Sequence, residues 1–545
     1  MPRAEFLTRP WVRCFAAASL VLACTSAARA AMPVRSCASL ESLAADLASD
    51  GLIVKASRMV SAGRVPGSDE LYQPPALLPE HCLFRGSFGS RVGVGGRRFE
   101  LRFELRMPTH WNGRFLFEGG GDLDGVDWPA YGSLFGRLSP TALARGFAVV
   151  RTNSGHTSPT GSSTDATFAV DQQARIDYGF NALDRVTLEA KKIVDIYYGR
   201  QPAHSYFVGC SNGGRQAMEV TERFPLYFDG VVAGDPSFDI SHVAPWMLWN
   251  VQVLSRIAPK DASGHPILSK AFSDMDLKLV VNTAMKQCDA LDGLEDGMIN
   301  DMAGCHFDPG ILTCRGPKTP SCLTKDQVTA MREVMQGPLD EAGKPIYRSF
   351  PYDAGFAQGW RVIHLGSSPT AVSNSFEATL GLATVAYHSL TPPDPGLDPL
   401  TFSFPQALAR VEQTAAMNDA DWTFLNTFAA HGKLILYQGI SDYGLSANQL
   451  AAWYEKLHAD TGGHTHNWAR LFLVPGMGHC DGGPATDQFD PLAAIVSWVE
   501  HGKAPDRIIA TGKHFPGESR PLCPWPKVAR YVGGDSRKAQ SFACR

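Results

Sequence analysis

The sequence has little net charge and no long apolar stretch after its first thirty residues. Its 50 Lys and Arg nearly balance its 54 Asp and Glu, which gives a formal net charge of −4 over 545 residues. No basic stripe indicates nucleic-acid binding, and no acidic tract indicates disorder. No segment after residue 30 approaches the roughly 20 apolar residues that cross a membrane. We therefore expect a soluble, globular, exported protein whose size favours two domains.

Residues 1–30 have the pattern of a secretory signal peptide. Arginines precede an apolar run over residues 14–23, and small residues follow it. A transmembrane anchor is the weaker interpretation, because this run is shorter than a bilayer requires. Cys24 ends a marginal lipoprotein cleavage pattern. A periplasmic, a secreted and a lipid-anchored product therefore all stay open.

Cysteine is present, but no two cysteines have the CxxC spacing that is typical of zinc sites. Of the 12 cysteines, Cys14 and Cys24 fall in the expected signal peptide, and the remaining number is even. Export implies an oxidising compartment, where an even set of cysteines indicates disulfides. The sequence alone does not fix their connectivity.

The segment at 206–215 reads YFVGCSNGGR, an apolar run that breaks at GxSxG before a helix-forming stretch over residues 214–223. This is the pattern of a nucleophile elbow, in which small residues flanking the serine let two backbones approach closely. The N-terminus of the following helix would favour negative charge beside the serine. A glycine-rich turn with an incidental serine is the plain alternative. We take Ser211 as the candidate nucleophile.

Two later strand ends supply partners for this serine in the chain order that an elbow requires, which is serine, acid, histidine. An apolar run at 433–439 ends just before Asp442, and another at 470–475 ends just before His479. We expect His479 to accept the proton of Ser211 and Asp442 to orient and stabilise the imidazolium. An acyl-enzyme would then form and be hydrolysed.

One disulfide has a spatial argument. Cys210 precedes the nucleophile and Cys480 follows the proposed base, and the side chains of those two neighbours must come within hydrogen-bond reach. We therefore predict a Cys210–Cys480 bond. The economical remainder pairs sequence neighbours: Cys37 with Cys82, Cys288 with Cys305, Cys314 with Cys322, and Cys523 with Cys544.

A glycine loop at 118–122 (EGGGD) follows the strand expected at 114–117 and can present bare backbone N–H groups. Phosphate binding is disfavoured, because acidic residues crowd the loop and no lysine follows as in a P-loop. An oxyanion hole is the better use, with one donor from Asn212 and another from Gly120 or Gly121. A plain tight turn stays the alternative.

The expected strands at 97–107, 114–117, 147–151 and 206–208, with a helix at 182–198 between them, predict an α/β fold with a mostly parallel sheet. Ser211 and Asp442 are too far apart for one or two β/α units. We place an inserted lid at residues 237–420, between catalytic segments 31–236 and 421–545. Its aromatic residues would either bind an apolar group or form the lid's own core.

Inside this insertion, residues 288–298 (CDALDGLEDGM) gather acids and glycines in a tight loop. Hard oxygen ligands at close spacing suggest calcium, although the EF-hand spacing is absent. The candidate ligands are the carboxylates of Asp289, Asp292 and Asp296 and the carbonyls of Leu294 and Met298. A solvated acidic turn is the alternative. Any ion here would be structural.

Taken together, GCSNGG around Ser211, SD at Asp442, GHC at His479 and the acidic loop after Cys288 resemble the tannase and feruloyl esterase family. The resemblance covers nearly the whole mature chain, and its most specific feature is the pair of cysteines beside the serine and the histidine. It implies an α/β-hydrolase core with a large inserted lid, a structural calcium ion, and hydrolysis of esters of aromatic carboxylic acids. The glycine loop matches less well, since Asp122 stands where another glycine is expected.

The resemblance also extends to enzymes that cleave the monoester of terephthalate with ethylene glycol, in which a lid arginine grips the substrate's carboxylate. Between Arg361 and Arg410 this chain has no Lys or Arg. We therefore favour esters of hydroxycinnamic or gallic type, with terephthalate mono- or diesters as the alternative. A peptidase with the same triad and a non-catalytic, calcium-bound binding module are the rivals of other classes. The oligomeric state is not predicted.

Overall fold

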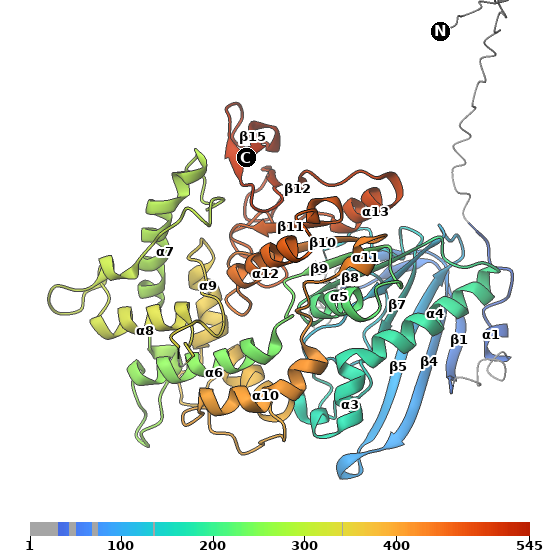
Figure 1. Ribbon diagram of the computed structural model, residues 1–545, viewed down its shortest axis with the longest axis horizontal. Coiled ribbons are helices and arrows are strands. Elements are labelled where there is room, and N and C mark those ends of the chain that lie inside the picture. Colours follow the sequence, from blue (N-terminus) through green and yellow to red (C-terminus); the bar gives the residue numbers. More distant parts are fainter. Residues whose placement is uncertain (1–30, 43–50, 68–74, 135–136, 341) are drawn as a thin grey trace, which may run out of the picture.

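A nine-stranded mixed sheet forms the centre of the protein (Figure 1). The computed structural model describes residues 31–42, 51–67, 75–134, 137–340 and 342–545, so the expected signal peptide lies outside the described part. In spatial order the strands are β1 (Ile53–Val60), β4 (His81–Val92), β5 (Arg98–Pro108), β7 (Ala148–Thr152), β6 (Arg114–Glu118), β8 (His204–Cys210), β9 (Gly230–Gly234), β10 (Lys433–Gly439) and β11 (Ala469–Val474). Three two-stranded sheets accompany it: β2 (Gly63–Val65) with β3 (Ala76–Leu78), β12 (Ile508–Ala510) with β13 (Arg520–Leu522), and β14 (Ala529–Tyr531) with β15 (Phe542–Cys544).

The sheet is parallel in one half and antiparallel in the other. From β7 to β11 all neighbours are parallel, whereas β1, β4 and β5 form an antiparallel extension that joins β7. A parallel pair needs a long crossover, and the few residues between β4 and β5 allow only a hairpin. The expectation of a mostly parallel sheet therefore describes the half that carries the catalytic candidates, and the extension departs from it.

Helices cover both faces of the parallel half, so its strands are buried on both sides. Along β8, Phe207 packs on one face with α4 (Ala182–Tyr198), α5 (Asn212–Arg223) and α12 (Ala447–Asp460). Its neighbours Tyr206 and Val208 pack on the other face, where α13 (Pro491–His501) lies. This alternation follows from the two-residue period of a strand. Two short helices, α1 (Ser39–Ser42) and α3 (Gln172–Ile176), complete the N-terminal half.

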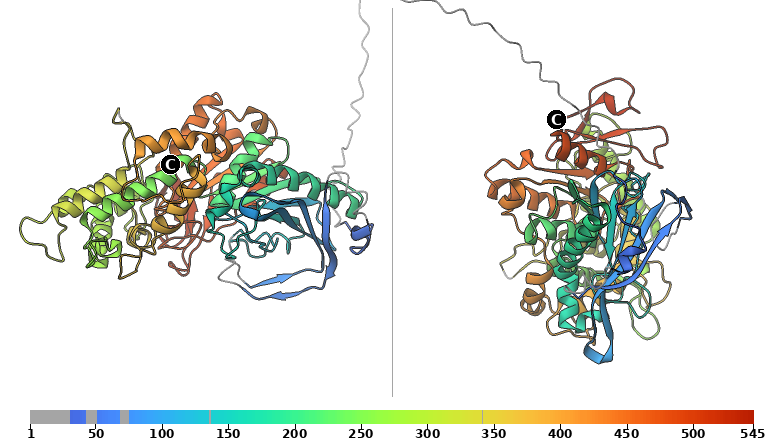
Figure 2. Two further views of the ribbon diagram at one scale, coloured as in Figure 1. Left: turned by 90° about the horizontal axis from the view of Figure 1, so that it is seen from below. Right: turned by 90° about the vertical axis from the view of Figure 1, so that its right-hand side faces the viewer.

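A helical insertion fills the chain between β9 and β10. Its helices are α6 (Ile240–Ile257), α7 (Asp274–Cys288), α8 (Lys325–Gln336), α9 (Phe356–Trp360) and α10 (Phe404–Asn418), with π-helical turns at Arg361–Leu365, Glu377–Gly381 and Thr384–Ser389. The short helix α11 (Asn426–Ala429) follows the insertion and packs in the core on the sheet face. The views of Figure 2 place most of it at one end of the molecule, with β1 and β4 at the other. The chain leaves and returns side by side, because the N–H of Ala420 donates to the carbonyl of Phe238 at 2.8 Å.

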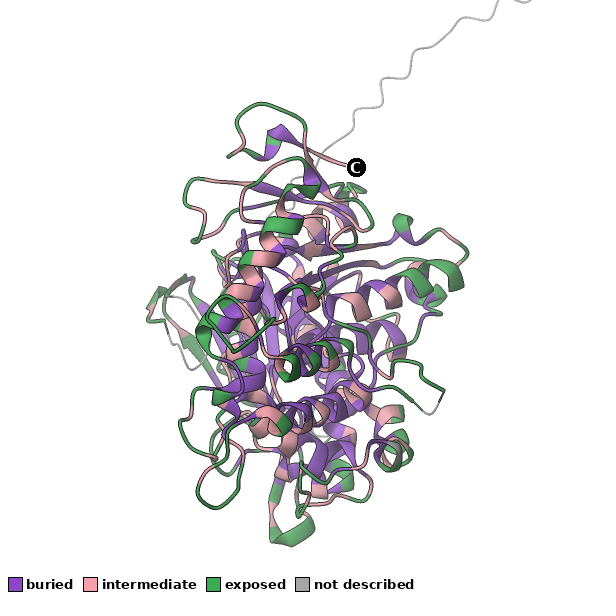
Figure 3. Cartoon of the chain, turned by 90° about the vertical axis from the view of Figure 1, so that its left-hand side faces the viewer, coloured by how far each residue is buried: buried purple, intermediate pink, exposed green. Residues whose placement is uncertain are grey.

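Most of the insertion's aromatic residues build its own core. Trp246 and Trp360 are fully buried, and Trp246 stacks on Phe350 with ring centroids 4.5 Å apart. This cluster is largely separate from the cores on the two faces of the sheet. Figure 3, seen from the insertion end, shows its buried segments inside and its exposed loops outside. These two tryptophans therefore form the insertion's own core.

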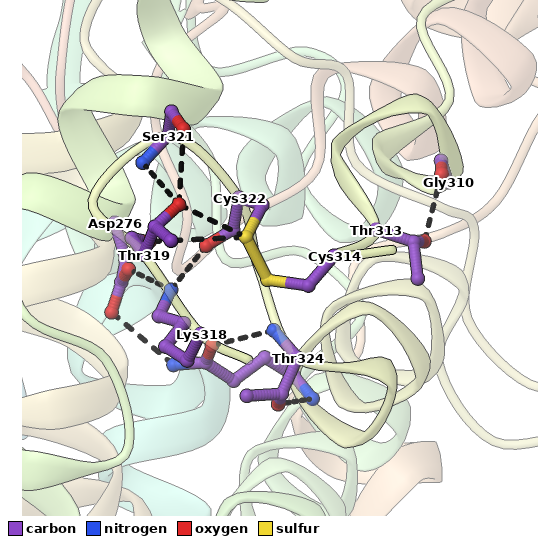
Figure 4. The surroundings of a disulfide bond; sticks show 10 residues. Asp276, Gly310, Thr313, Cys314, Lys318, Thr319, Ser321, Cys322 and Thr324 are labelled. Atoms are coloured by element: carbon purple, nitrogen blue, oxygen red, sulfur yellow. Dashed lines mark hydrogen bonds and ion pairs between the residues drawn. A yellow bond between two sulfur atoms is a disulfide. The ribbon is translucent and has the colours of Figure 1, made fainter. Parts of the chain in front are cut away.

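All five expected disulfides are present: Cys37–Cys82, Cys210–Cys480, Cys288–Cys305, Cys314–Cys322 and Cys523–Cys544. Four of these disulfides join cysteines that are between 8 and 45 residues apart in the sequence. Cys314–Cys322 closes a surface loop in which Lys318 donates to the carbonyl of Cys322 and pairs with Asp276 of α7 (Figure 4). Cys210–Cys480 is different, because its sequence separation is 270.

Candidate active site

Ser211 occupies a strained turn between β8 and α5. Its φ is 63° and its ψ is −125°, a conformation that costs free energy for any residue other than glycine. A Cβ atom on Gly209 would lie 2.2 Å from the carbonyl oxygen of Gly213, and one on Gly213 would lie 2.7 Å from the carbonyl oxygen of Gly120. Neither position has room for a side chain. The turn is thus the elbow that GxSxG predicts.

Asp442 and His479 lie at the carboxyl ends of β10 and β11 and face each other. His479 Nδ1 donates to Asp442 Oδ2 at 2.7 Å. The other Asp442 oxygen accepts from the N–H groups of Gly444 and Leu445 at 2.9 and 3.1 Å, which holds the buried carboxylate in place. Ser211 and His479 line the same two cavities. The structure therefore brings the three predicted residues together.

The charge of this acid determines the basicity of the imidazole. Burial lowers the pKa of His479, but the Asp442 carboxylate raises it by more, with further help from Asp235 and Asp122, to about 9. An imidazolium at His479 is therefore strongly stabilised. This is what a base needs when it takes a proton from a serine hydroxyl.

The Cys210–Cys480 disulfide joins the turns that carry Ser211 and His479. The two Cα atoms lie 6.0 Å apart, and each cysteine is adjacent in sequence to its catalytic neighbour. Without this bond, only packing and hydrogen bonds would fix the loop after β11 relative to the loop after β8. The disulfide therefore limits how far the imidazole can move from the hydroxyl.

A second buried carboxylate, Asp235, lies beneath this group, and the sequence reasoning missed it. One of its carboxylate oxygens, a carboxylate oxygen of Asp442 and a ring nitrogen of His479 all lie within 4.8 Å of one another. Gly439 N–H donates to Asp235 Oδ1 at 2.8 Å, and Gln438 Nε2 reaches both Asp235 and Asp442 at 3.1 Å. Burial and the charge of Asp442 raise the pKa of Asp235 to about 8. The sequence feature that could have identified Asp235 is its position directly after β9, where the strand ends at the same edge of the sheet as Ser211 and Asp442.

The oxyanion candidates separate into available and occupied donors. Asn212 begins α5, and its side chain is held from below by Asp124. The N–H of Gly120 donates to Gln216 Oε1 at 2.9 Å and is therefore not available to an oxyanion. Gly120, one of the two glycines predicted as the second donor, is thereby corrected. Gly121 lines the cavity beside Ser211 and His479. Gly121 is therefore the glycine left to pair with Asn212.

A buried polar network fixes the glycine loop against α5. Asp124 accepts from Asn212 Nδ2 and from Ser154 Oγ, both at 2.7 Å. Arg215 Nε donates to Asn212 Oδ1 at 2.9 Å. The Tyr178 hydroxyl lies 3.1 Å from the same oxygen and 3.2 Å from the Asp122 carbonyl. These groups hold both oxyanion donors, and no local motif marks them in the sequence.

A cavity of about 260 Å³ opens beside Ser211 and is mostly apolar. The insertion supplies much of its lining, namely Ile240, Val243, Ala244, Met247, Val362, Ile363, Phe376, Leu380, Gly381 and Thr384. Among the residues that the structure describes, its lining includes no Lys or Arg, and its charged side chains are Asp122, Asp442 and His479. Arg361 instead pairs with Asp274, and Arg410 with Asp394.

A second, smaller cavity of about 150 Å³ also borders Ser211 and His479. It shares Asp122, Ser211 and His479 with the large cavity and adds Gly121, Trp128, Cys480 and Asp481.

The acidic loop brings its carboxylates close enough to repel one another. Asp289 accepts from the N–H groups of Asp296 and Gly297, at 3.1 and 3.0 Å. Burial, together with the charges of Asp296 and Asp289, raises the pKa of Asp292 to about 6. Arg520 near the C-terminus pairs with Asp296 at 2.7 Å. Carboxylates are the hard oxygen donors that suit a calcium ion, but Asp289, Asp292 and Asp296 are not among the described side-chain groups whose ligand atoms all lie within 4.8 Å of one another.

The comparisons with known proteins agree with this geometry. A family model described as "Tannase and feruloyl esterase" matches residues 89–545. The chain is 40% identical to the mono(2-hydroxyethyl) terephthalate hydrolase of Piscinibacter sakaiensis, over 86% of this chain and 85% of that protein. It is 28% identical to a probable feruloyl esterase B-2 of Aspergillus flavus, over 76% and 77% of the two chains.

Solved structures show the same fold. Feruloyl esterase B from Aspergillus oryzae superposes with a TM-score of 0.76 at 24% identity, over 93% of this chain and all of that one. A tannin acyl hydrolase from Aspergillus niger gives 0.70 at 21% identity, over 91% and 92%. The expected α/β-hydrolase fold is confirmed.

Proposed function

The chain belongs to the tannase and feruloyl esterase family and is a carboxylic ester hydrolase, and we propose that it cleaves esters of aromatic acids through an acyl-enzyme on Ser211. The apolar cavity of about 260 Å³ that opens directly beside this serine carries the proposal. Its volume and lining suit one aromatic ring with a short substituent. Membership of an esterase family also argues against the non-catalytic binding module and the peptidase.

In this mechanism the serine hydroxyl attacks the ester carbonyl while His479 Nε2 takes its proton. Asp442 stabilises the resulting imidazolium through the 2.7 Å hydrogen bond to Nδ1. The N–H groups of Asn212 and Gly121 are the proposed donors to the oxyanion. The imidazolium then protonates the leaving alcohol, and a water molecule activated by the same imidazole hydrolyses the acyl-enzyme.

The lining of the large cavity favours neutral aromatic acids of hydroxycinnamic or gallic type. Among the described residues it includes no Lys or Arg to grip a free carboxylate, and Asp122 would repel one. The alternative, hydrolysis of terephthalate mono- or diesters, is favoured by the 40% identity to a protein of that name. The two differ in the charge of the acyl group, which makes them separable by experiment.

The test compares kcat/KM for methyl ferulate, methyl gallate, the terephthalate monoester with ethylene glycol, and the corresponding diester. We expect one of the first two to be the best substrate. A clear preference for the monoester would overturn the assignment and favour the alternative. Ser211→Ala should lose turnover on all four and lose fluorophosphonate labelling. Retained turnover in this variant would refute the role of the serine.

We also propose that Asp289, Asp292 and Asp296, with the carbonyls of Leu294 and Met298, hold a structural calcium ion. The raised pKa of Asp292 supports this, because burial and the charges of Asp296 and Asp289 disfavour its carboxylate, and a bound cation would offset both. The ion would supply charge neutralisation and crosslink the loop that Cys288–Cys305 already closes. It takes no part in the chemistry at Ser211.

Export is the last element of the proposal. Five disulfides support an oxidising compartment. Among the described residues, no helix has the length and apolar character to span a bilayer. Fractionation of the producing cells, with intact-mass measurement of the mature N-terminus, would distinguish periplasmic, secreted and lipid-anchored products.

A further inference from the structure

The residue that interrupts the glycine loop, Asp122, has a backbone conformation that favours glycine. Its φ is 48°, in the left-handed region. The carboxylate is held rather than free, because Ser163 Oγ donates to Asp122 Oδ2 at 2.7 Å. No donor among the described residues reaches Oδ1 within hydrogen-bond distance. An acceptor with one anchored oxygen and one available oxygen thus stands beside the catalytic group.

Asp122 lies at the boundary between the two cavities. It lines the large apolar cavity and the small cavity, as Ser211 and His479 also do. Its negative charge reaches the imidazole, since it is one of the groups that raise the pKa of His479. A group bound next to the scissile oxygen would therefore be within its range.

The alcohol part of the ester belongs in the small cavity. If the aromatic acyl group fills the large cavity, the leaving oxygen points the other way, towards the imidazole that protonates it. The small cavity is lined by His479, Asp122 and Asp481, with Trp128 and, among the described residues, no Lys or Arg. A space bordered by two carboxylates attracts hydrogen-bond donors such as hydroxyl groups.

We propose that Asp122 is a specificity-determining residue that accepts a hydrogen bond from a second hydroxyl on the alcohol part of the ester. Esters of diols and polyols are then preferred over esters of simple alcohols with the same acid. Ser163 acts as a positioning residue by fixing the carboxylate. The inference rests on the proposed function, since it assigns the aromatic acid to the large cavity.

The experiment compares ethyl ferulate with 2-hydroxyethyl ferulate, which differ by one hydroxyl and share the acyl group. In the wild type we expect kcat/KM to be about tenfold higher for the hydroxyethyl ester, a ratio that corresponds to about 1.4 kcal/mol. Asp122→Asn fits the left-handed conformation and removes the charge, so the ratio should fall severalfold. Asp122→Gly removes the acceptor, so the ratio should fall to about 1. Ser163→Ala should give an intermediate value.

Because both esters form the same acyl-enzyme and use the same oxyanion donors, a general disturbance of the loop cancels in the ratio. Asp127→Asn is the matched control, because it removes the same charge from the same loop at an exposed position where Asp127 pairs with Arg102. Its ratio should equal that of the wild type.

The outcomes separate the two proposals. If the wild type cleaves neither ester, the proposed function fails and this inference falls with it. If it cleaves both equally, the proposed function stands and the role of Asp122 is refuted, whether or not the variants fold. An unchanged ratio in Asp122→Gly would refute it in the same way.

Discussion

Removing the Cys210–Cys480 disulfide tests whether it holds the serine and the histidine in reach of each other or only stabilises the fold. The double variant Cys210→Ala with Cys480→Ala removes the only covalent crosslink between the two catalytic turns in the described part of the chain. For a separation of 270 residues, loop-closure entropy gives a stabilisation of about 5 to 6 kcal/mol. This is an upper value, because two other disulfides shorten the loop in the unfolded chain.

The matched control is Cys314→Ala with Cys322→Ala, which removes a disulfide in a surface loop of the insertion. For a separation of 8 residues the same relation gives about 2.5 kcal/mol. Both double variants should therefore unfold at lower temperature than the wild type. The Cys210/Cys480 variant should show the larger shift.

Turnover distinguishes the two roles. A misplacement of about 1 Å between reacting groups costs roughly a hundredfold in rate. We therefore expect kcat to fall about a hundredfold in the Cys210/Cys480 variant and to stay within about twofold of the wild type in the control. The measurement is made well below both unfolding midpoints, with active sites counted by fluorophosphonate labelling. If the first variant unfolds early but keeps its kcat, the disulfide is not needed to position the base.

Four further changes test the site and its supports. kcat/KM should rise with pH, with a midpoint near pH 9, because His479 must be neutral to accept a proton. A midpoint of this rise near pH 6.5 would contradict the effect of Asp442 on the pKa of His479. The same ion pair stabilises the fold fully below about pH 6.5, and this contribution is lost as pH rises through about 9 in thermal unfolding. Chelation of calcium should lower the unfolding temperature. The decrease should grow as pH rises through about 6, because Asp292 loses its proton there. An Asp292→Asn variant whose unfolding temperature responds equally to the chelator would contradict this. Asp235→Asn should keep its activity at neutral pH. The wild type should become less stable as pH rises towards 8 and Asp235 ionises, and this variant should not. An inactive variant at pH 7 would show that the negative charge of Asp235 is needed. Gly213→Ala should abolish activity in the folded protein, because a Cβ atom would clash with the carbonyl of Gly120 2.7 Å away, and normal turnover would refute the close approach.

The candidate catalytic residues could be picked out from the sequence because the pattern around each of them is local. Ser211, Asp442 and His479 follow strands whose apolar runs are clear in the sequence, and they stand in the order that the fold requires. The helix expected at 182–198 likewise matches α4. Where a strand and the turn after it lie within about ten residues, the local sequence pattern contains most of the information that determines their structure.

The features that escaped prediction depend on contacts between distant segments. β9 is five residues of GVVAG, too short and too evenly apolar to be distinguished from a buried turn before its neighbours β8 and β10 are known. The choice between Gly120 and Gly121 depends on Gln216, which lies 96 residues further along the chain and occupies the first N–H. Asp235 acquires its role only because β9 is placed next to β10.

The site divides reactivity from selectivity between two parts of the chain. The proposed nucleophile, base, acid and oxyanion donors all lie on turns of the sheet, and hydrogen bonds and a disulfide fix them. The apolar walls of the large cavity come largely from the insertion, whose core is largely separate. A substitution in the insertion, such as at Met247 or Phe376, can therefore change the accepted acid without changing the pKa of His479. Asp122 is the exception, because it belongs to the sheet side, faces both cavities and acts on the imidazole, so its replacement should alter selectivity and pH dependence together.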